Sequence, residues 1–206
     1  MNEILRLFPH LSALQVKQLE ALGALYADWN QKINVISRKD IDNLYPHHVM
    51  HSLAIAHALN PIAGTSILDF GTGGGFPGIP LAIVWPECSF HLIDSTGKKI
   101  RVVNEVVQAI GLTNVRATHI RGEEERGKYD YVVSRAVMPL PDLARIVRKN
   151  ISSRQRNALP NGILCLKGGD ISAETAPFRH IVEVTPLSGW TPDEWYKEKY
   201  LIYLPI

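Results

Sequence analysis

The sequence predicts an α/β protein in which a helical N-terminal extension precedes a largely parallel sheet. Two observations lead to this fold class. The first 60 residues carry apolar side chains at helical spacing, and from Ser66 onward short β-rich runs alternate with segments of helical length. Because parallel strands need long crossover connections, this alternation favours a parallel sheet. We expect one structural unit, with residues 1–60 packed as a helical extension on a core formed by residues 61–206.

The N-terminal extension contains two helical stretches. Ser12 and Gln15 have the spacing of a capping box, which predicts a helix start. Apolar residues then recur at spacings that alternate between three and four residues, which places them on one face of a helix. They are Leu19, Leu22, Tyr26, Trp29 and Ile33. A second stretch runs from about Asp40 to Leu59, and we expect a kink or restart at Pro46 because proline cannot continue the hydrogen-bond ladder.

Seven short runs predict the strands of the sheet. The last two are joined without a helical pattern, so we expect them to form an antiparallel pair at the end of the sheet. The runs are SILDF, SFHLID, NVRATHI, YDYVVS, GILCLK, HIVEVT and KYLIYLP.

Composition excludes some classes of function. The chain has 206 residues, 22 Lys and Arg against 20 Asp and Glu, and a net charge of +2, so any contact with RNA must come from a local patch. Cys88 and Cys165 lack CxxC spacing and sit in apolar runs, which favours reduced, buried thiols in a cytosolic protein. No apolar run has membrane-spanning length and no leader pattern follows Met1, so we expect a cytoplasmic protein without a membrane partner.

The stretch LDFGTGGGFPGIP, residues 68–80, follows the first expected strand and is the main candidate for a binding loop. Residues 73–78 spell G-x-G-x-x-G, the dinucleotide fingerprint. Pro77 and Pro80, however, remove two N–H donors where a pyrophosphate needs several. A ligand without phosphate therefore fits better, and the absence of a G-x-x-x-x-G-K-S/T motif also disfavours a nucleoside triphosphate.

S-adenosylmethionine is a nucleoside ligand of this kind. Asp69, just before Gly71-Thr72-Gly73, supplies a carboxylate for its cationic groups, directly or through hydrogen bonds of the loop. Asp94 ends the next strand, where a carboxylate can accept both ribose hydroxyls. Residues 121–123 follow the third strand and can present backbone groups to the adenine edge. The alternative reading is an ordinary turn with charged loop residues.

At this point the sequence resembles a known family, the bacterial small-subunit ribosomal RNA guanine-N7 methyltransferases, formerly called glucose-inhibited division protein B. The resemblance covers most of the chain. Five segments carry it in order: WNQKINVIS (29–37), DFGTGGGFPGIPLAI (69–83), LIDSTGKK (92–99), VVSRA (132–136) and LKGG (166–169).

The resemblance implies a Rossmann-like methyltransferase fold and methyl transfer from S-adenosylmethionine to N7 of guanine 527 in 16S rRNA. The partner is then 16S rRNA or the small ribosomal subunit, and we expect a monomer. Carried over by position, the cofactor contacts fall on Gly71, Phe76, Gly122, Glu123 and Arg135, with Asp94 at the ribose.

One segment departs from the family pattern. An Arg-His pair followed three residues later by Asp-Ser is usual, but HHVMHSL keeps only His48 and Ser52 and has His47 and His51 at the charged positions. The three histidines have helical spacing that can hold a metal. Because no acidic or cysteine ligand accompanies them in the sequence, we expect no metal site.

The chemistry that the resemblance implies needs no base. Guanine N7 already carries an in-plane lone pair, so proximity and orientation can supply most of the rate. Cys165 lies inside an apolar strand, which argues against a thiol nucleophile. Arg135 and Lys167, at strand ends beside the glycine loop, are the candidates for holding the target phosphate or base, with solvated surface charges as the alternative.

Eight further basic residues are candidates for an RNA footprint, although such runs are usually solvated helix faces. They are Lys98, Lys99, Arg101, Arg145, Arg148, Lys149, Arg154 and Arg156. Three other functions stay open: a small-molecule methyltransferase, a nicotinamide dehydrogenase, which the prolines disfavour, and a non-catalytic regulator that binds the cofactor.

Overall fold

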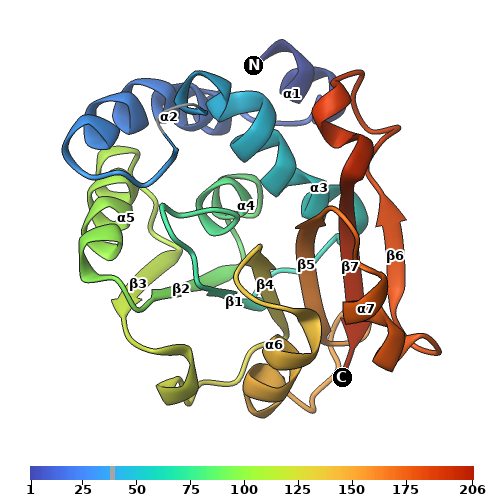
Figure 1. Cartoon of the computed structure of the whole chain (residues 1–206). Helices are drawn as coiled ribbons and strands as arrows, with labels where there is room; N and C mark the ends of the chain where they lie inside the picture. Colours follow the sequence, from blue (N-terminus) through green and yellow to red (C-terminus); the bar gives the residue numbers. More distant parts are fainter. Residues whose placement is uncertain (38–39) are drawn as a thin grey trace.

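A seven-stranded sheet runs through the centre of the computed structural model, which describes residues 1–37 and 40–206 (Figure 1). The strand order is β3-β2-β1-β4-β5-β7-β6, and the first five strands are parallel. The strands are β1 (Ser66–Phe70), β2 (Ser89–Asp94), β3 (Val115–His119), β4 (Tyr131–Arg135), β5 (Gly162–Gly168), β6 (Glu183–Pro186) and β7 (Lys199–Pro205). The α/β prediction and the seven expected runs are thereby confirmed.

The last two strands form the antiparallel pair expected from the sequence. Strand β7 inserts between β5 and β6 and runs antiparallel to both. The described segments that connect β5, β6 and β7 contain no helix long enough for a crossover between parallel strands. The chain therefore reverses direction, and the strands pair antiparallel.

The direction of the strand order reverses between β1 and β4. From β1 the chain continues to β2 and β3 on one side, and then crosses back to β4, which pairs with β1 at Asp69 and Val133. The loops after β1 and β4 therefore leave the sheet in opposite directions. In open α/β sheets a crevice forms at this point, above the carboxyl ends of the strands.

Helices cover both faces of the sheet (Figure 1). On one side lie α4 (Gly78–Val84) and α5 (Gly97–Ala109), and on the other α6 (Leu140–Val147). The short α7 (Ser172–Thr175) contacts α6. No helix among the described residues is long and apolar enough to cross a membrane.

The N-terminal helices are α1 (Asn2–Leu7), α2 (Ala13–Lys32) and α3 (Met50–Ala58). Helix α2 packs on α4 and α5, and α3 packs on α4. The capping box of α2 is present, since the Ser12 hydroxyl accepts from the Gln15 amide at 3.3 Å and the Gln15 side chain accepts from the Ser12 amide at 2.8 Å. Leu19, Leu22 and Tyr26 are fully buried in the core shared with the sheet. A boundary at residue 60 stays a prediction.

The expected interruption at Pro46 takes the form of a π-helical turn. A 3-10 turn at Ile41–Asn43 leads into the π turn Leu44–Val49, and α3 follows directly. The missing N–H of Pro46 removes one bond of an α-helical ladder, and the wider turn accommodates the ring.

Candidate functional site

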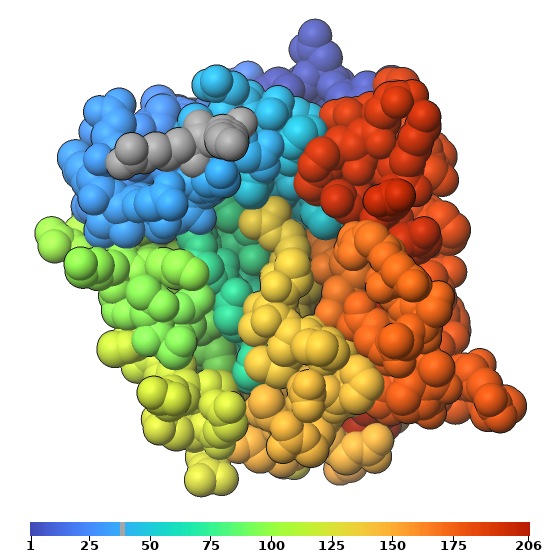
Figure 2. All heavy atoms as spheres, in the orientation of Figure 1, coloured from blue at the N-terminus to red at the C-terminus, as the bar shows by residue number. Residues whose placement is uncertain are grey.

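A cavity of about 510 Å³ opens at the point where the strand order reverses. Figure 2 shows the surface hollowed there, between the blue N-terminal segment, the green α5 and the yellow segment after β4. We call it the glycine-loop cavity. Its lining includes Gly71, Gly73, Phe76, Asp94, Gly122, Glu123 and Arg135, together with Val35, Phe70, Ile93, Lys99, Ile120 and residues 136–138.

The glycine loop has a backbone that other residues adopt only with strain. Gly71, Gly73 and Gly75 have φ values of +69°, +58° and +101°. A Cβ at Gly71 would lie 2.6 Å from a methyl of Val137, whereas one at Gly73 would meet no protein atom within 4 Å. At Gly73, therefore, bare backbone faces open space that a ligand can occupy.

Helix α2 supports this loop from behind. The Tyr26 hydroxyl donates to the Gly74 carbonyl at 2.5 Å, and a Cβ at Gly74 would lie 3.1 Å from Val35. The helical extension thus fixes the shape of the loop and contributes Val35 to the cavity. Sequence reasoning missed this contribution, because the spacing of an amphipathic helix does not tell which part of the sheet it covers.

Asp69 acts on the loop and does not line the cavity. It is fully buried, and its Oδ2 accepts from the Thr72 hydroxyl at 2.6 Å and the Gly78 amide at 2.8 Å. Burial raises the pKa of this carboxyl to about 7, although both hydrogen bonds oppose the shift. Of the two routes left open by the sequence, these contacts support the indirect one, through hydrogen bonds of the loop.

Asp94 connects the two loops that flank the cavity. Its Oδ2 accepts from the Gly73 amide at 2.9 Å and its Oδ1 from the Thr96 amide at 2.8 Å. Each carboxylate oxygen has a second lone pair, so both can still accept from a ligand hydroxyl. This geometry suits a pair of vicinal hydroxyls such as those of a ribose.

We expect Asp94→Asn to weaken binding of S-adenosylmethionine about 10- to 100-fold. The amide removes the charge and turns one acceptor into a donor that faces the N–H of Gly73 or of Thr96, and charge-assisted bonds are worth about 1.5–3 kcal/mol each. Calorimetry measures the affinity, with Asp142→Asn on the exposed face of α6 as the control. A change of less than threefold would mean that Asp94 is only a strand-end acid.

Gly122 and Glu123 form the far edge of the cavity, in the 3-10 turn Gly122–Glu124 after β3. A Cβ at Gly122 would overlap the ring of Phe70, so only glycine lets this backbone approach the end of β1. The Glu123 carbonyl accepts from the Lys149 amine. With the apolar Ile93 and Ile120 nearby, this edge can hold a flat heterocycle against backbone groups.

Arg135 ends β4 and is held from three sides. Its guanidinium carbon lies 5.1 Å from the centroid of the Phe76 ring, and Nη2 lies 3.1 Å from Nδ1 of His48. Nη1 donates to the His47 carbonyl at 3.5 Å. Burial lowers the pKa of Arg135 to about 10, with Asp69 opposing the shift, so the group is charged at neutral pH.

The amine of Lys167, near the end of β5, makes two polar contacts, and both are with other residues of the protein. It donates to the Met138 carbonyl at 2.5 Å and lies 2.7 Å from Oε2 of Glu174, with 9% of the side chain exposed. These contacts hold the segment after β4 in place. A direct contact of Lys167 with RNA stays a prediction.

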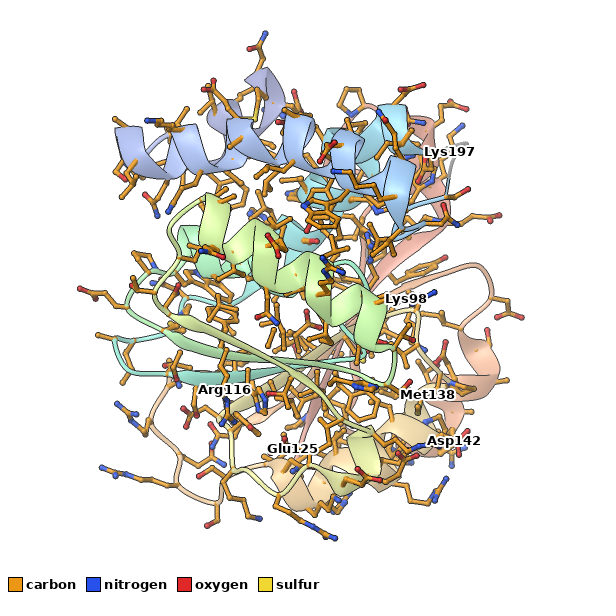
Figure 3. The ribbon with its side chains drawn as sticks, turned by 90° about the vertical axis from the view of Figure 1, so that its left-hand side faces the viewer. Lys98, Arg116, Glu125, Met138, Asp142 and Lys197 are labelled. Atoms are coloured by element: carbon orange, nitrogen blue, oxygen red, sulfur yellow. The ribbon has the colours of Figure 1, made fainter. Side chains whose placement is uncertain are left out.

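The basic residues named from the sequence do not form one patch. Lys99 lines the cavity, and Figure 3 shows Lys98 at the start of α5, at the same end of the strands as Met138. Arg156, by contrast, donates to the carbonyls of Ala63 and Gly64 before β1, at the amino end of the strands. The structure thus separates Arg156 from the cavity.

A second cavity of about 490 Å³ adjoins the first, and we call it the histidine cavity. Arg135 and Ala136 belong to both. Ala136 has φ +50°, a strained value for a residue other than glycine and one that is common at functional sites. The remaining lining residues are His47, His48, His51, Leu166, Lys167, Gly168, Trp195 and Lys199.

The histidines have an acidic partner that sequence reasoning missed. Asp40 Oδ1 lies 2.7 Å from Nδ1 of His47, and its Oδ2 lies 2.7 Å from Nε2 of His48. The prediction that no acidic side chain accompanies these histidines was therefore wrong. The π turn brings His47 and His48 back over Asp40. Over residues 1–37 and 40–206, no three His, Cys, Asp or Glu side chains are grouped as metal ligands.

We expect the free energy of unfolding to fall between pH 6.5 and 4.5. Burial lowers the pKa of His48 to about 4, and it also lowers the pKa values of His51 and His91, so the unfolded chain binds more protons at all three imidazoles in this window. The raised pKa of Asp69 contributes one proton in the opposite sense. Each proton of the difference is worth about 1.4 kcal/mol per pH unit, and the histidine contributions outnumber that of Asp69.

Urea unfolding at pH 4.5, 5.5 and 6.5 measures this loss. In His51→Phe the loss should be smaller by about 1.4 kcal/mol per pH unit, because one of the histidine contributions is gone. A wild-type protein that gains stability on acidification would show that these imidazoles are not buried in the neutral form.

Comparisons with known proteins agree with this geometry. The family model described as rRNA small subunit methyltransferase G, GidB, matches residues 15–184. The ribosomal RNA small subunit methyltransferase G of Bacteroides fragilis is 56% identical over 206 residues, which is 100% of each chain. Its counterpart in Bacteroides thetaiotaomicron is 57% identical, also over 206 residues and 100% of each chain.

A similar solved structure is that of a mutant MtNAS in complex with S-adenosylmethionine. The TM-score is 0.58 at 13% identity, and the match covers 95% of this chain and 77% of that chain. At this identity the likeness concerns the fold alone, and it confirms the expected Rossmann-like arrangement.

Proposed function

The chain belongs to the GidB family of rRNA small subunit methyltransferases, and we propose that it transfers a methyl group from S-adenosylmethionine to N7 of guanine 527 in 16S rRNA. One observation carries the proposal furthest. The glycine-loop cavity is lined by bare glycine backbone and by the Asp94 carboxylate with its two acceptor oxygens. It adjoins the histidine cavity, which is lined by cationic and aromatic side chains, and Arg135 lines both cavities.

The residues of the glycine-loop cavity fit the cofactor. Gly73 leaves room beside its amide, both Asp94 oxygens can accept from the ribose hydroxyls, and the Gly122–Glu123 backbone can face the adenine. S-adenosylmethionine supplies an electrophilic methyl group when bound. Asp69 takes part by holding the Thr72 hydroxyl and the Gly78 amide, which sets the course of the loop.

Methylation at guanine N7 makes modest demands on the protein. The nucleophile is a lone pair that is already free, so the protein has to orient the base and exclude water. We assign Arg135 to orienting the base, because its charged guanidinium is fixed between Phe76 and His48. Lys167 is assigned to the same task through the Met138 carbonyl that it holds.

The proposed partner is 16S rRNA, free or in the small ribosomal subunit. The enzyme would act as a monomer in the bacterial cytoplasm, where that RNA is made. Lys98, Lys99 and Arg101 at the start of α5 are the basic residues best placed to meet RNA at the cavity.

Chemical cleavage of the RNA tests the product. Methylation at N7 gives guanine a fixed positive charge, so its imidazole ring opens on borohydride reduction and aniline then cuts the chain there. We expect this cut at guanine 527 in RNA from cells that make the protein and none in a deletion strain. Methyl groups on an exocyclic amine, a ribose or a pyrimidine carbon give no such cut, so the same pattern in both strains would refute the assignment.

A further inference from the structure

The histidine cavity lies where a group must sit to react at the glycine-loop cavity. The two cavities share Arg135 and Ala136, at the end of β4 and directly after it. A ligand in the histidine cavity therefore contacts the same guanidinium as a ligand in its neighbour. This position is required of an acceptor in a direct transfer, where reacting atoms approach to about 3–3.5 Å.

The lining of the histidine cavity has the chemistry of a nucleotide site. Arg135 and Lys199 bring positive charge, whereas the Lys167 amine is paired with Glu174, and no carboxylate is among the lining residues. Trp195 stacks on His47 with ring centroids 4.4 Å apart, and His51 meets the Trp195 edge at 5.1 Å. Aromatic walls with cations at the rim suit a base and its phosphate.

His51 has unused hydrogen-bonding capacity in this cavity. Its side chain is 4% exposed, and within the described part of the chain Nε2 has no hydrogen-bond partner. Leaving a buried polar group unpaired is costly, so Nε2 gains from a partner that a ligand supplies. Trp195 and Tyr196 pack nearly perpendicular to the imidazole, with ring centroids 5.1 and 5.9 Å away, and hold it in place.

Lys199 is a second group in this cavity that can still bind a ligand. Its amine lies 4.3 Å from the centroid of the Trp195 ring, and no carboxylate of the described residues forms an ion pair with it. The other face of the indole is covered by His47. A flexible lysine on this aromatic face can move to a phosphate and leave the face free.

We propose that the histidine cavity receives the target guanine, with the imidazole of His51 donating a hydrogen bond to the base and Lys199 contacting the phosphate of the same nucleotide. A neutral imidazole has one N–H donor and one acceptor nitrogen, and we place the proton on Nε2, the nitrogen without a partner. Guanine presents the O6 acceptor beside N7, whereas adenine presents an N6 donor at the corresponding place. Donation to O6 leaves the N7 lone pair free and selects guanine over adenine. This inference rests on the proposed function.

The test uses small ribosomal subunits from a strain that lacks the protein. His51→Phe keeps the ring packed against Trp195 and Tyr196 but removes both nitrogens, and His57→Phe on the exposed side of α3 is the control. We expect His51→Phe to lower kcat/KM about 10- to 100-fold with the S-adenosylmethionine affinity changed less than twofold. His51→Gln retains a donor and should recover part of this loss.

Lys199→Ala gives a second, independent readout. It should raise KM for the subunits and reduce the slope of log affinity against log salt by about one. Lys197→Ala, whose exposed amine is paired with Glu194 at 2.7 Å, should change neither (Figure 3 labels Lys197).

The outcomes separate the two proposals. A wild-type protein that leaves N7 of guanine unmodified overturns the proposed function. If the wild type methylates N7 and folded His51→Phe and Lys199→Ala both keep kcat/KM within twofold, the base lies elsewhere and this inference is wrong. Should His51→Phe fail to fold, His51→Gln and Lys199→Ala still decide.

Discussion

Replacing Gly73 with valine should abolish binding of S-adenosylmethionine, with a loss of at least about 100-fold in affinity. Gly73 has φ +58°, and a Cβ at this position meets no protein atom within 4 Å, so the valine methyls would stand in the cavity that the glycine lines. The added volume excludes the ligand from the bare backbone. A 100-fold loss of affinity corresponds to about 2.8 kcal/mol of lost contact.

Backbone strain is a competing explanation, and Gly111→Val controls for it. Gly111, after α5, has φ +68° and equally open surroundings, but it does not line the glycine-loop cavity. A β-branched residue there costs about the same 1–2 kcal/mol of backbone energy. Calorimetry should therefore find wild-type affinity in Gly111→Val and none in Gly73→Val, with both proteins folded. Equal affinity in the two variants would remove the glycine loop from the cofactor site.

The sequence was sufficient to place the glycine-loop cavity, because its parts follow consecutive strands. Strands of a parallel sheet end at one edge, so Gly71, Asp94 and Gly122 had to lie together once the strands were identified. The order of the strands does not predict, however, in which direction the Asp69 side chain points. Asp69 lies on β1 beneath the loop, and its role depends on whether it faces the cavity or the helix.

The histidine cavity could not be predicted, because its walls come from segments distant in sequence. Trp195 belongs to the 3-10 turn Glu194–Glu198 and Lys199 begins β7, and both reach the end of β4 only because β7 inserts beside β5. The pairing of Asp40 with His47 likewise depends on a π turn that no propensity predicts. A tryptophan and a lysine four residues apart gave no signal by themselves.

Arg135→Lys should lower the rate of methyl transfer about 100-fold while the protein stays folded. Lysine keeps the positive charge that Asp69 and the surrounding groups favour, but it lacks the planar fork that reaches His48 and the His47 carbonyl together. Charge-assisted bonds are worth about 1.5–3 kcal/mol each, and the loss of two of them from the wall between the cavities lets the base shift. About 3 kcal/mol in the barrier corresponds to about 100-fold in rate.

A single-turnover measurement with saturating S-adenosylmethionine and small ribosomal subunits reports this rate without the contribution of product release. Arg145→Lys is the matched control, since its side chain on α6 is 73% exposed and its one partner, Asp142, is also at the surface. We expect the control to react like the wild type and Arg135→Lys to show the same melting temperature within a few degrees. A rate within threefold of the wild type in folded Arg135→Lys would mean that the guanidinium only fills space between Phe76 and His48, and that the base is oriented by other groups.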